Sequence, residues 1–279
     1  MTIKEFLDEI TAVFEKAGIS CAQREALLLA CHILSCEQIY ILTHKDEYID
    51  EKILLAAAAL VNERCKGRPL AYIMGSADFC GIDITVDERV LIPRPETELL
   101  VEEVLGSDLI SVKGLKILDL CTGSGCIAAA LASNLPNASI CASDLSLRAL
   151  QLAGYNLRPY ENAKTLKSDL FEKVEGKFHI IVSNPPYVAE RDRESLQREV
   201  KDHEPEMSLF AGEDGLDIIR KIVPKAADHL EKDGLFLMEM GESQAEEVLR
   251  LAEETGCYYD ISIKKDLSGL DRYLKARKK

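Results

Sequence analysis

The sequence of 279 residues has no excess of positive charge, no long apolar segment and no closely paired cysteines. Its 34 Lys and Arg against 48 Asp and Glu give a net charge of −14, which excludes the diffuse basic surface typical of nucleic-acid-binding proteins. No apolar run approaches the ~18 residues of a membrane span, and the N-terminus is too acidic for a signal peptide. The nine cysteines include no C-x-x-C pair, so we expect reduced thiols in a cytoplasmic protein, with no metal site.

The hydrophobic content and the length of the chain are sufficient for two folded domains. Hydrophobic residues make up 47% of the chain and charged residues 29%, which is close to the averages of globular proteins. A chain of this length exceeds one ordinary domain. No internal repeat or low-complexity tract interrupts it.

The first 75 residues carry apolar side chains at helical spacing only. Thr2 and Glu5 form a capping box ahead of the first helix, and Ser20 with Gln23 marks the start of a second. We therefore predict a small all-helical N-terminal domain over residues 1–75, with further helices at 37–43 and 50–64.

Between residues 76 and 92 the apolar period changes to two. The alternation runs from Phe79 to Val86 and resumes at Val90, which predicts two short strands around Asp87 and Glu88. We interpret residues 76–92 as a β-hairpin that links two domains.

From Lys116 onward the chain alternates apolar runs with helical patterns. Such alternation predicts an α/β domain over residues 93–279, with a parallel sheet covered on both faces. The last two runs have no helix between them, so the final strand should be antiparallel. The seven expected strands are 116–120, 139–143, 165–170, 178–183, 235–240, 260–263 and 272–275.

A glycine-rich turn follows the first strand of this domain. The strand 116–120 leads into Cys121, Thr122, Gly123, Ser124 and Gly125, and then into a helix. Such a turn lets a ligand approach the backbone and the helix N-terminus closely. Asp144 ends the next strand, where a carboxylate can hold both hydroxyls of a ribose. These features predict a nucleoside-containing cofactor.

The turn alone does not decide between S-adenosylmethionine and NAD. Gly123-x-Gly125-x-x-Ala128 formally fits the dinucleotide-binding pattern. Asp119, just before the turn, can order the loop and the ammonium group of S-adenosylmethionine, which favours that cofactor. Asp169, Leu170 and Phe171, at the next strand end, would border the adenine.

A second candidate site follows the strand 178–183 and consists of Asn184, Pro185, Pro186 and Tyr187. Two prolines fix the backbone and leave carbonyls that no local N–H can satisfy. The Asn184 side-chain oxygen and the Pro185 carbonyl can accept both hydrogens of a planar NH₂ group, and Tyr187 offers a flat face for stacking. This arrangement suits an amide or exocyclic amine nitrogen.

With these two sites the sequence resembles the class I S-adenosylmethionine-dependent methyltransferases with an Asn-Pro-Pro-Tyr motif. It is most similar to the bacterial peptide chain release factor glutamine methyltransferases. The motifs that carry this closer resemblance are 68–75, 91–98, Glu199-Val200, Glu204-Pro205, 212–217 and 266–272. Cys121 stands where this family usually has glycine, and Leu170 where relatives often have an aromatic residue.

The resemblance implies a Rossmann-like seven-stranded methyltransferase sheet and transfer of a methyl group to the side-chain nitrogen (N5) of the glutamine in the Gly-Gly-Gln motif of class 1 release factors. It implies that Asn184 to Tyr187 hold this amide and that Arg94 and Thr97 lie near the methionine end of the cofactor. The expected cofactor residues are Arg94, Thr97, Cys121, Thr122, Gly123, Ser124, Gly125, Asp144, Leu170, Phe171 and Asn184. The helical domain would dock the release factor.

Three alternatives remain open at this point. The same motifs serve methyltransferases that modify a ribosomal-protein glutamine or an adenine or guanine amine of nucleic acid. The glycine turn would also suit an NAD-dependent oxidoreductase. The helical domain would also suit a non-enzymatic binding module. The acidic charge disfavours nucleic acid, so we expect a monomeric enzyme with a protein partner and no direct contact to nucleic acid or membrane.

Overall fold

The computed structural model describes all residues, 1–279, as two compact units. The first unit consists of Met1–Gly75 and Gln197–His203, and the second of Ser76–Leu196 and Glu204–Lys279. The segment Gln197–His203 therefore belongs with the helices, although the sequence pattern placed it in the C-terminal domain. None of the helices combines the length and the apolar character that a membrane crossing requires.

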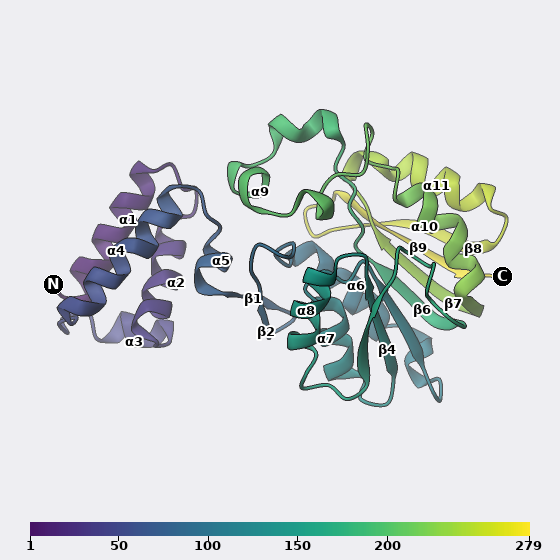
Figure 1. Ribbon diagram of the computed structural model, residues 1–279, viewed down its shortest axis with the longest axis horizontal. Helices are drawn as coiled ribbons and strands as arrows, with labels where there is room; N and C mark the ends of the chain where they lie inside the picture. The colour runs from purple at the N-terminus through teal and green to yellow at the C-terminus, as the bar shows by residue number, and fades with distance from the viewer. The chain divides into compact units, whose positions relative to one another are not determined.

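Five helices form most of the first unit (Figure 1). Glu5 N–H donates to Thr2 Oγ1 at 3.2 Å and Thr2 N–H donates to Glu5 Oε2 at 2.9 Å, which confirms the predicted capping box. The predicted cap at Ser20 is wrong, because the second helix starts at Ala22 and Cys21 precedes it without a side-chain cap. The helices are α1 (Ile3–Lys16), α2 (Ala22–Leu34), α3 (Gln38–Thr43), α4 (Glu51–Cys65) and α5 (Leu70–Met74).

A buried arginine ties the later segment to these helices. Arg64 Nε donates to Glu25 Oε2 at 2.5 Å, and Arg64 Nη2 lies 3.1 Å from Glu199 Oε2 of α9 (Arg198–His203). A buried guanidinium needs such paired carboxylates to offset its loss of water. This pairing gives a physical reason for the place of α9 in the first unit.

The second unit begins with the hairpin of β1 (Ser76–Phe79) and β2 (Ile82–Thr85). Its turn lies at Cys80 and Gly81, which have φ of 52° and 73° as a two-residue hairpin turn requires. The predicted turn at Asp87 and Glu88 is therefore wrong. Cysteine is uncommon at positive φ, so the sequence carried only a weak signal for this turn.

A sheet of seven strands forms the centre of the second unit, in the order β5-β4-β3-β6-β7-β9-β8. β9 is antiparallel to both of its neighbours, as predicted, and the other pairs are parallel. The strands are β3 (Lys116–Leu120), β4 (Ser139–Asp144), β5 (Ala163–Lys167), β6 (Phe178–Ser183), β7 (Leu230–Glu239), β8 (Tyr258–Lys265) and β9 (Asp271–Lys278).

Helices cover both faces of this sheet (Figure 1). One buried cluster joins α10 (Ile219–Ala226) and α11 (Ala245–Glu254) to β3, β6, β7 and β9 through Ile222, Val248, Ile181 and Phe236. The other face carries α6 (Pro95–Leu105), α7 (Cys126–Asn134) and α8 (Leu147–Asn156). Short 3₁₀ turns complete the unit: η1 (Asp108–Ser111), η2 (Glu190–Ser195), η3 (Glu206–Ser208), η4 (Ala227–His229) and η5 (Glu242–Gln244).

The chain order in the sheet reverses between β3 and β6. From β3 the chain winds outward to β4 and β5, and then returns to β6 on the other side of β3. Open α/β sheets bind ligands at the carboxyl ends of the strands at such a reversal. Both predicted motifs follow these two strands.

Candidate active site

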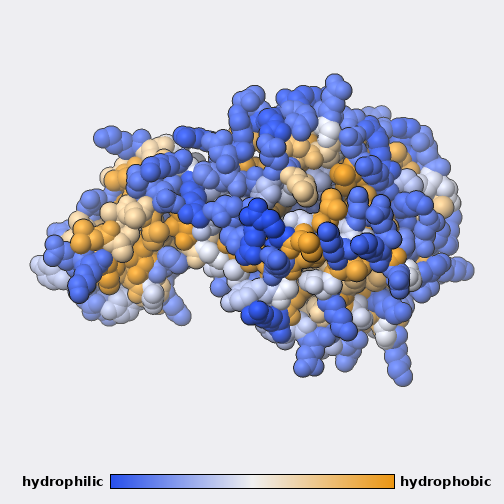
Figure 2. Space-filling view, in the orientation of Figure 1, coloured by the Kyte–Doolittle hydropathy of each residue, from blue (hydrophilic) through white to orange (hydrophobic).

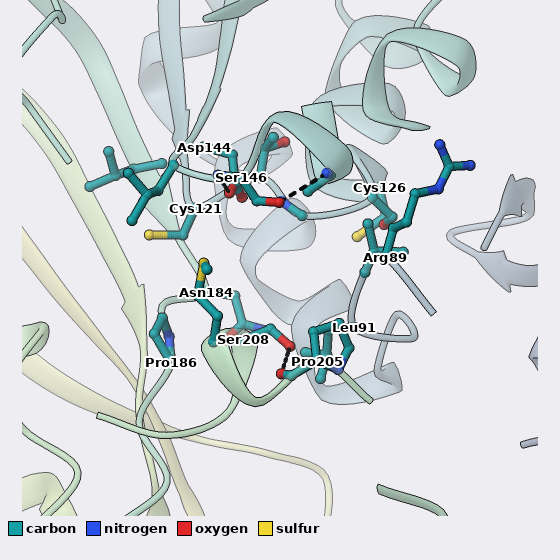
Figure 3. Close-up of a pocket in the computed structure, with 18 of the residues that line it drawn as sticks. Arg89, Leu91, Cys121, Cys126, Asp144, Ser146, Asn184, Pro186, Pro205 and Ser208 are labelled. Carbon is teal, nitrogen blue, oxygen red and sulfur yellow. Dashed lines mark hydrogen bonds between the residues drawn. The ribbon is translucent and has the colours of Figure 1, made fainter. Parts of the chain in front are cut away.

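A cavity of about 300 Å³ lies within the second unit at this strand reversal. Its wall combines the turn after β3, the ends of β4 and β6, the loop 88–94 before α6, and residues 205–208. Figure 3 shows Cys121, Asp144 and Ser146 on one side of it and Asn184, Pro186 and Ser208 on the other. The two motifs that the sequence singled out therefore face one shared space.

The turn after β3 is open on the side of the cavity. Gly123 has a φ of 55°, and no atom lies within 4 Å of the position that a Cβ would take there. Gly125, with a φ of 81°, lies so close to α8 that its Cβ would be 3.1 Å from that of Ala153. The first glycine leaves room for a ligand, and the second allows two helices to approach each other.

Cys121 adopts a left-handed conformation, with a φ of 61°. This conformation costs an ordinary residue ~1–2 kcal/mol more than it costs glycine. We expect Cys121→Gly to be more stable than Cys121→Ala by ~1 kcal/mol, since both lack the sulfur and only glycine relieves the backbone. Urea unfolding of the two variants measures this difference, and equal stabilities would show that the backbone at residue 121 is unstrained.

Asp119 is fully buried beneath the turn. Its Oδ2 accepts hydrogen bonds from Thr122 Oγ1 at 2.5 Å and from Ala128 N–H at 3.2 Å, while Oδ1 has no partner. Burial raises the pKa of Asp119 to about 7. The carboxyl group orders the loop, as predicted, but it does not line the cavity.

The raised pKa of Asp119 predicts a pH-dependent stability. The folded protein retains a proton at this carboxyl group that the unfolded chain loses near pH 4, so its contribution is complete below pH 4 and is lost as the pH rises towards 7. We expect Asp119→Asn to gain stability relative to the wild type between pH 5 and pH 7, by the order of 1 kcal/mol per pH unit. Urea unfolding at both pH values tests this, and a constant difference would contradict it.

Asp144 lies at the end of β4, as expected, with its carboxylate tied to the glycine turn. Oδ2 accepts from Gly123 N–H at 2.9 Å and Oδ1 from Ser146 N–H at 2.8 Å. Burial raises the pKa of Asp144, and these backbone hydrogen bonds oppose that rise. A carboxylate has about four acceptor sites, so Asp144 can still accept from a hydroxyl group in the cavity.

The loop after β5 contributes Asp169 and Leu170 to the cavity wall. Leu170 has a φ of 46°, and its side chain packs partly against the core. Phe171 does not line the cavity: it is buried and stacks on the ring of His229, with 4.8 Å between centroids. The Phe171 ring therefore packs in the core, next to the cavity residue Leu170 in the sequence.

Asn184 lies directly after β6, whose last residue Ser183 donates from Oγ to the Leu120 carbonyl at 2.7 Å. Asn184 Nδ2 donates to Thr97 Oγ1 at 3.0 Å, and Thr97 Oγ1 donates to Glu239 Oε2 at 2.7 Å. Both Asn184 and Thr97 line the cavity, and Glu239 is buried behind them. The Asn184 oxygen has no partner within the protein.

The other members of the tetrapeptide support this loop. Tyr187 OH donates to Glu239 Oε1 at 2.9 Å, and Gln244 Nε2 donates to the Tyr187 carbonyl, also at 2.9 Å. Gly215 makes room for that carbonyl, because a Cβ there would overlap it. Pro186 lines the cavity, whereas Pro185 and Tyr187 are not part of its wall.

Arg94 reaches the cavity from the loop before α6. Its Nη2 donates to Glu204 Oε1 at 2.5 Å, and the Ile92 N–H donates to the other oxygen of Glu204. This pairing holds the loop 88–94 against residues 205–208. The sequence did not single out Glu204, Glu239 or Gln244 as site residues, although a carboxylate at the end of the apolar strand β7 was a visible signal for Glu239.

Comparison with known proteins agrees with this geometry. The PrmC N-terminal domain family matches residues 5–75, and the methyltransferase small domain family matches residues 95–202. A release factor glutamine methyltransferase of Thermodesulfovibrio yellowstonii is 40% identical over 96% of both chains. The chain belongs to the release factor glutamine methyltransferase family. Another member, from Koribacter versatilis, is 38% identical over 100% of this chain and 99% of its own.

Solved structures of lower identity share the fold of this family member. A methyltransferase from Pyrococcus furiosus is 20% identical, covers 81% of this chain and 98% of its own, and has a TM-score of 0.52. The hMettl16 catalytic domain is 15% identical with a TM-score of 0.55, and 82% of each chain is covered. The Rossmann-like methyltransferase sheet with an antiparallel last strand is therefore confirmed.

Membership of this family implies S-adenosylmethionine as the methyl donor, and the cavity fits it. The open space over Gly123 admits a ligand against the backbone. Asp144 can still accept from a hydroxyl group, while Leu145 and Leu170 add apolar surface for a ring. The volume of about 300 Å³ is in the range of small-molecule sites.

Proposed function

We propose that this enzyme methylates the side-chain amide nitrogen (N5) of the glutamine in the Gly-Gly-Gln motif of class 1 peptide chain release factors. The observation that carries the proposal is the Asn184 amide at the cavity wall. Its nitrogen is engaged by Thr97, so its oxygen is the atom left to receive a substrate hydrogen. The relatives that match this chain over nearly its full length are named release factor glutamine methyltransferases.

The roles of the cavity residues follow from their positions. We assign the turn Cys121–Gly125, Asp144 and Leu170 to cofactor binding, and Asp144 to the ribose hydroxyls. Arg94 and Thr97 also line the cavity, and Thr97 is hydrogen-bonded to Asn184. Phe171 stacks on His229 in the core cluster against which Leu170 packs, so we assign it a supporting role for the adenine-binding part of the cavity.

Positioning of the acceptor nitrogen is the main task of the protein. S-adenosylmethionine supplies an activated methyl group when it is bound, whereas an amide nitrogen is a poor nucleophile because its lone pair is delocalised. The Asn184 oxygen and the Pro185 carbonyl accept no hydrogen bond within the protein, so both can accept from the substrate NH₂. Holding the nitrogen in line for attack can supply ~7–11 kcal/mol of the barrier.

We assign no general base to this site. His179 lies within β6, five residues before Asn184, and its Nδ1 accepts from the Lys116 N–H at 3.0 Å. This bond gives the imidazole a structural role in the sheet. The proton of the methylated amide can leave to water after the methyl group has been transferred.

The helical unit offers a surface for a protein substrate. Figure 2 shows apolar side chains gathered on the visible face of this unit. Tyr48, Leu55 and Ile39 are 83%, 71% and 63% exposed. Apolar side chains gathered on one exposed face favour a protein partner, and the net charge of −14 disfavours nucleic acid. We propose that this unit docks the release factor and that the enzyme acts as a monomer.

Transfer of a labelled methyl group tests the substrate. The enzyme is incubated with methyl-labelled S-adenosylmethionine and a recombinant release factor, a Gln→Ala variant of its Gly-Gly-Gln motif, or a ribosomal fraction. We expect label on the wild-type factor alone. Label only in the ribosomal fraction would move the activity to a ribosomal protein or RNA, and a thermal shift with NAD but not with S-adenosylmethionine would contradict methyl transfer.

A further inference from the structure

The buried chain of hydrogen bonds behind Asn184 has a defined direction. It runs from Asn184 Nδ2 to Thr97 Oγ1 at 3.0 Å and from Thr97 Oγ1 to Glu239 Oε2 at 2.7 Å. The Thr97 hydroxyl donates its one hydrogen to Glu239, as it must to a carboxylate that is ionised and can only accept. The Thr97 oxygen is then left to accept, and only the NH₂ group of Asn184 can donate to it.

Several groups around Glu239 stabilise its charge. Tyr187 OH donates to its second oxygen at 2.9 Å, and the positive charge of Arg272 on β9 acts on it as well. Burial raises the pKa of Glu239, and the nearby charge of Glu96 adds to that rise, while the two hydroxyl donors and Arg272 oppose it. Arg272 is itself held by Asp266, whose Oδ2 lies 2.8 Å from Arg272 Nη2.

We propose that Glu239, acting through Thr97, fixes the orientation of the Asn184 amide and so makes the site select an amide over a carboxylate in the acceptor side chain. This inference rests on the proposed function. With its NH₂ group held by Thr97, Asn184 presents only an oxygen to the cavity. The side chains of glutamine and glutamate have nearly the same shape. An oxygen acceptor attracts the NH₂ group of glutamine and repels the carboxylate of glutamate, so it can distinguish them.

Substitutions at Thr97 and Glu239 test whether these residues orient the Asn184 amide or only support the structure around it. Thr97→Ser keeps the hydroxyl and should retain kcat within threefold. Thr97→Val keeps the shape of the side chain but removes the hydroxyl that links Asn184 to Glu239. Glu239→Gln no longer dictates the direction of these hydrogen bonds, because an amide can both donate and accept. Both should lower kcat at least tenfold with unchanged affinity for S-adenosylmethionine. Glu242→Gln, at an exposed carboxylate nearby, is the matched control.

Selectivity between amide and carboxylate is the readout that a purely structural role would not change. A release factor with Gln→Glu in its Gly-Gly-Gln motif is used as a competitive inhibitor of the normal substrate. In the wild type we expect its inhibition constant to exceed the KM of the normal factor at least tenfold. In Thr97→Val and Glu239→Gln this ratio should fall towards one, because Asn184 can then turn its NH₂ group to the cavity.

The outcomes are distinguishable. If the wild type does not methylate the release factor, the proposed function fails. If it does, but Thr97→Val and Glu239→Gln keep either their kcat or the wild-type selectivity, the inference on Glu239 is overturned. Loss of activity in Thr97→Ser equal to that in Thr97→Val would overturn it as well. If Glu239→Gln does not fold, the comparison of Thr97→Val with Thr97→Ser tests the inference by itself.

Discussion

Replacement of Asn184 by alanine is expected to reduce turnover by ~100- to 1,000-fold while the affinity for S-adenosylmethionine stays within a few-fold of the wild type. The loss has the size seen when one positioned hydrogen-bonding group is removed from an active site. Asn184 offers the cavity an oxygen acceptor that no group in the protein occupies. Without it, the substrate nitrogen loses one of its two acceptors and its alignment.

Single-turnover rates with the release factor, together with calorimetric titration of the cofactor, measure this prediction. Asn134→Ala is a matched control, since Asn134 is an exposed residue near the end of α7 that donates only to the Ala130 carbonyl. Turnover at the wild-type rate would refute the role of Asn184 in holding nitrogen. Loss of cofactor affinity with an unchanged rate constant would assign Asn184 to the cofactor instead.

Replacement of Asp144 by alanine is expected to weaken cofactor binding by ~10- to 100-fold. Hydrogen bonds to a charged group contribute ~1.5–3 kcal/mol each, and Asp144 is the carboxylate placed to receive the ribose hydroxyls. The same change releases Gly123 N–H and Ser146 N–H, so the glycine turn also loses an anchor. The rate constant at saturating cofactor should change much less than the affinity.

Two further variants locate the cause of this weakening. Asp144→Asn keeps an acceptor for the turn but removes the charge, so it should lie between alanine and the wild type. Asp8→Ala, at an exposed carboxylate of α1, should leave cofactor binding unchanged. Wild-type affinity in Asp144→Ala would show that the ribose lies elsewhere.

The sequence predicted those parts of the site that local patterns encode. The turn from Cys121 to Gly125 and the Asn-Pro-Pro-Tyr loop each depend on a strand followed at once by residues with restricted or unusual backbone angles. Parallel strands then bring both loops to one edge of the sheet. Asp144 could be placed for the same reason.

The groups that hold Asn184 in position could not be predicted from local patterns. Thr97 and Glu239 are separated from each other by 142 positions, and only the paired strands and α6 bring them together. Glu204 and Gln244 act over similarly long separations, on Arg94 and on the Tyr187 carbonyl. Such contacts depend on how helices and strands pack, which residue spacing does not encode.

Two differences between expectation and structure have a physical explanation as well. The sequence predicts the hairpin turn at Asp87 and Glu88 because the apolar alternation breaks there, whereas the structure turns at Cys80 and Gly81. Phe171 was expected beside the adenine, but an aromatic ring after β5 also suits the core, where it stacks on His229. In both cases tertiary packing overrode a local preference.

Tandem mass spectrometry of the release factor after reaction tests the central claim most directly. A wild-type factor incubated with the enzyme and S-adenosylmethionine is digested, and the fragment that contains the Gly-Gly-Gln motif is sequenced. The account predicts one added methyl group on the side-chain nitrogen of that glutamine, which is absent with Asn184→Ala. A methyl group on another residue or on an oxygen atom would contradict the proposed role of Asn184 and Pro185 in holding the amide nitrogen.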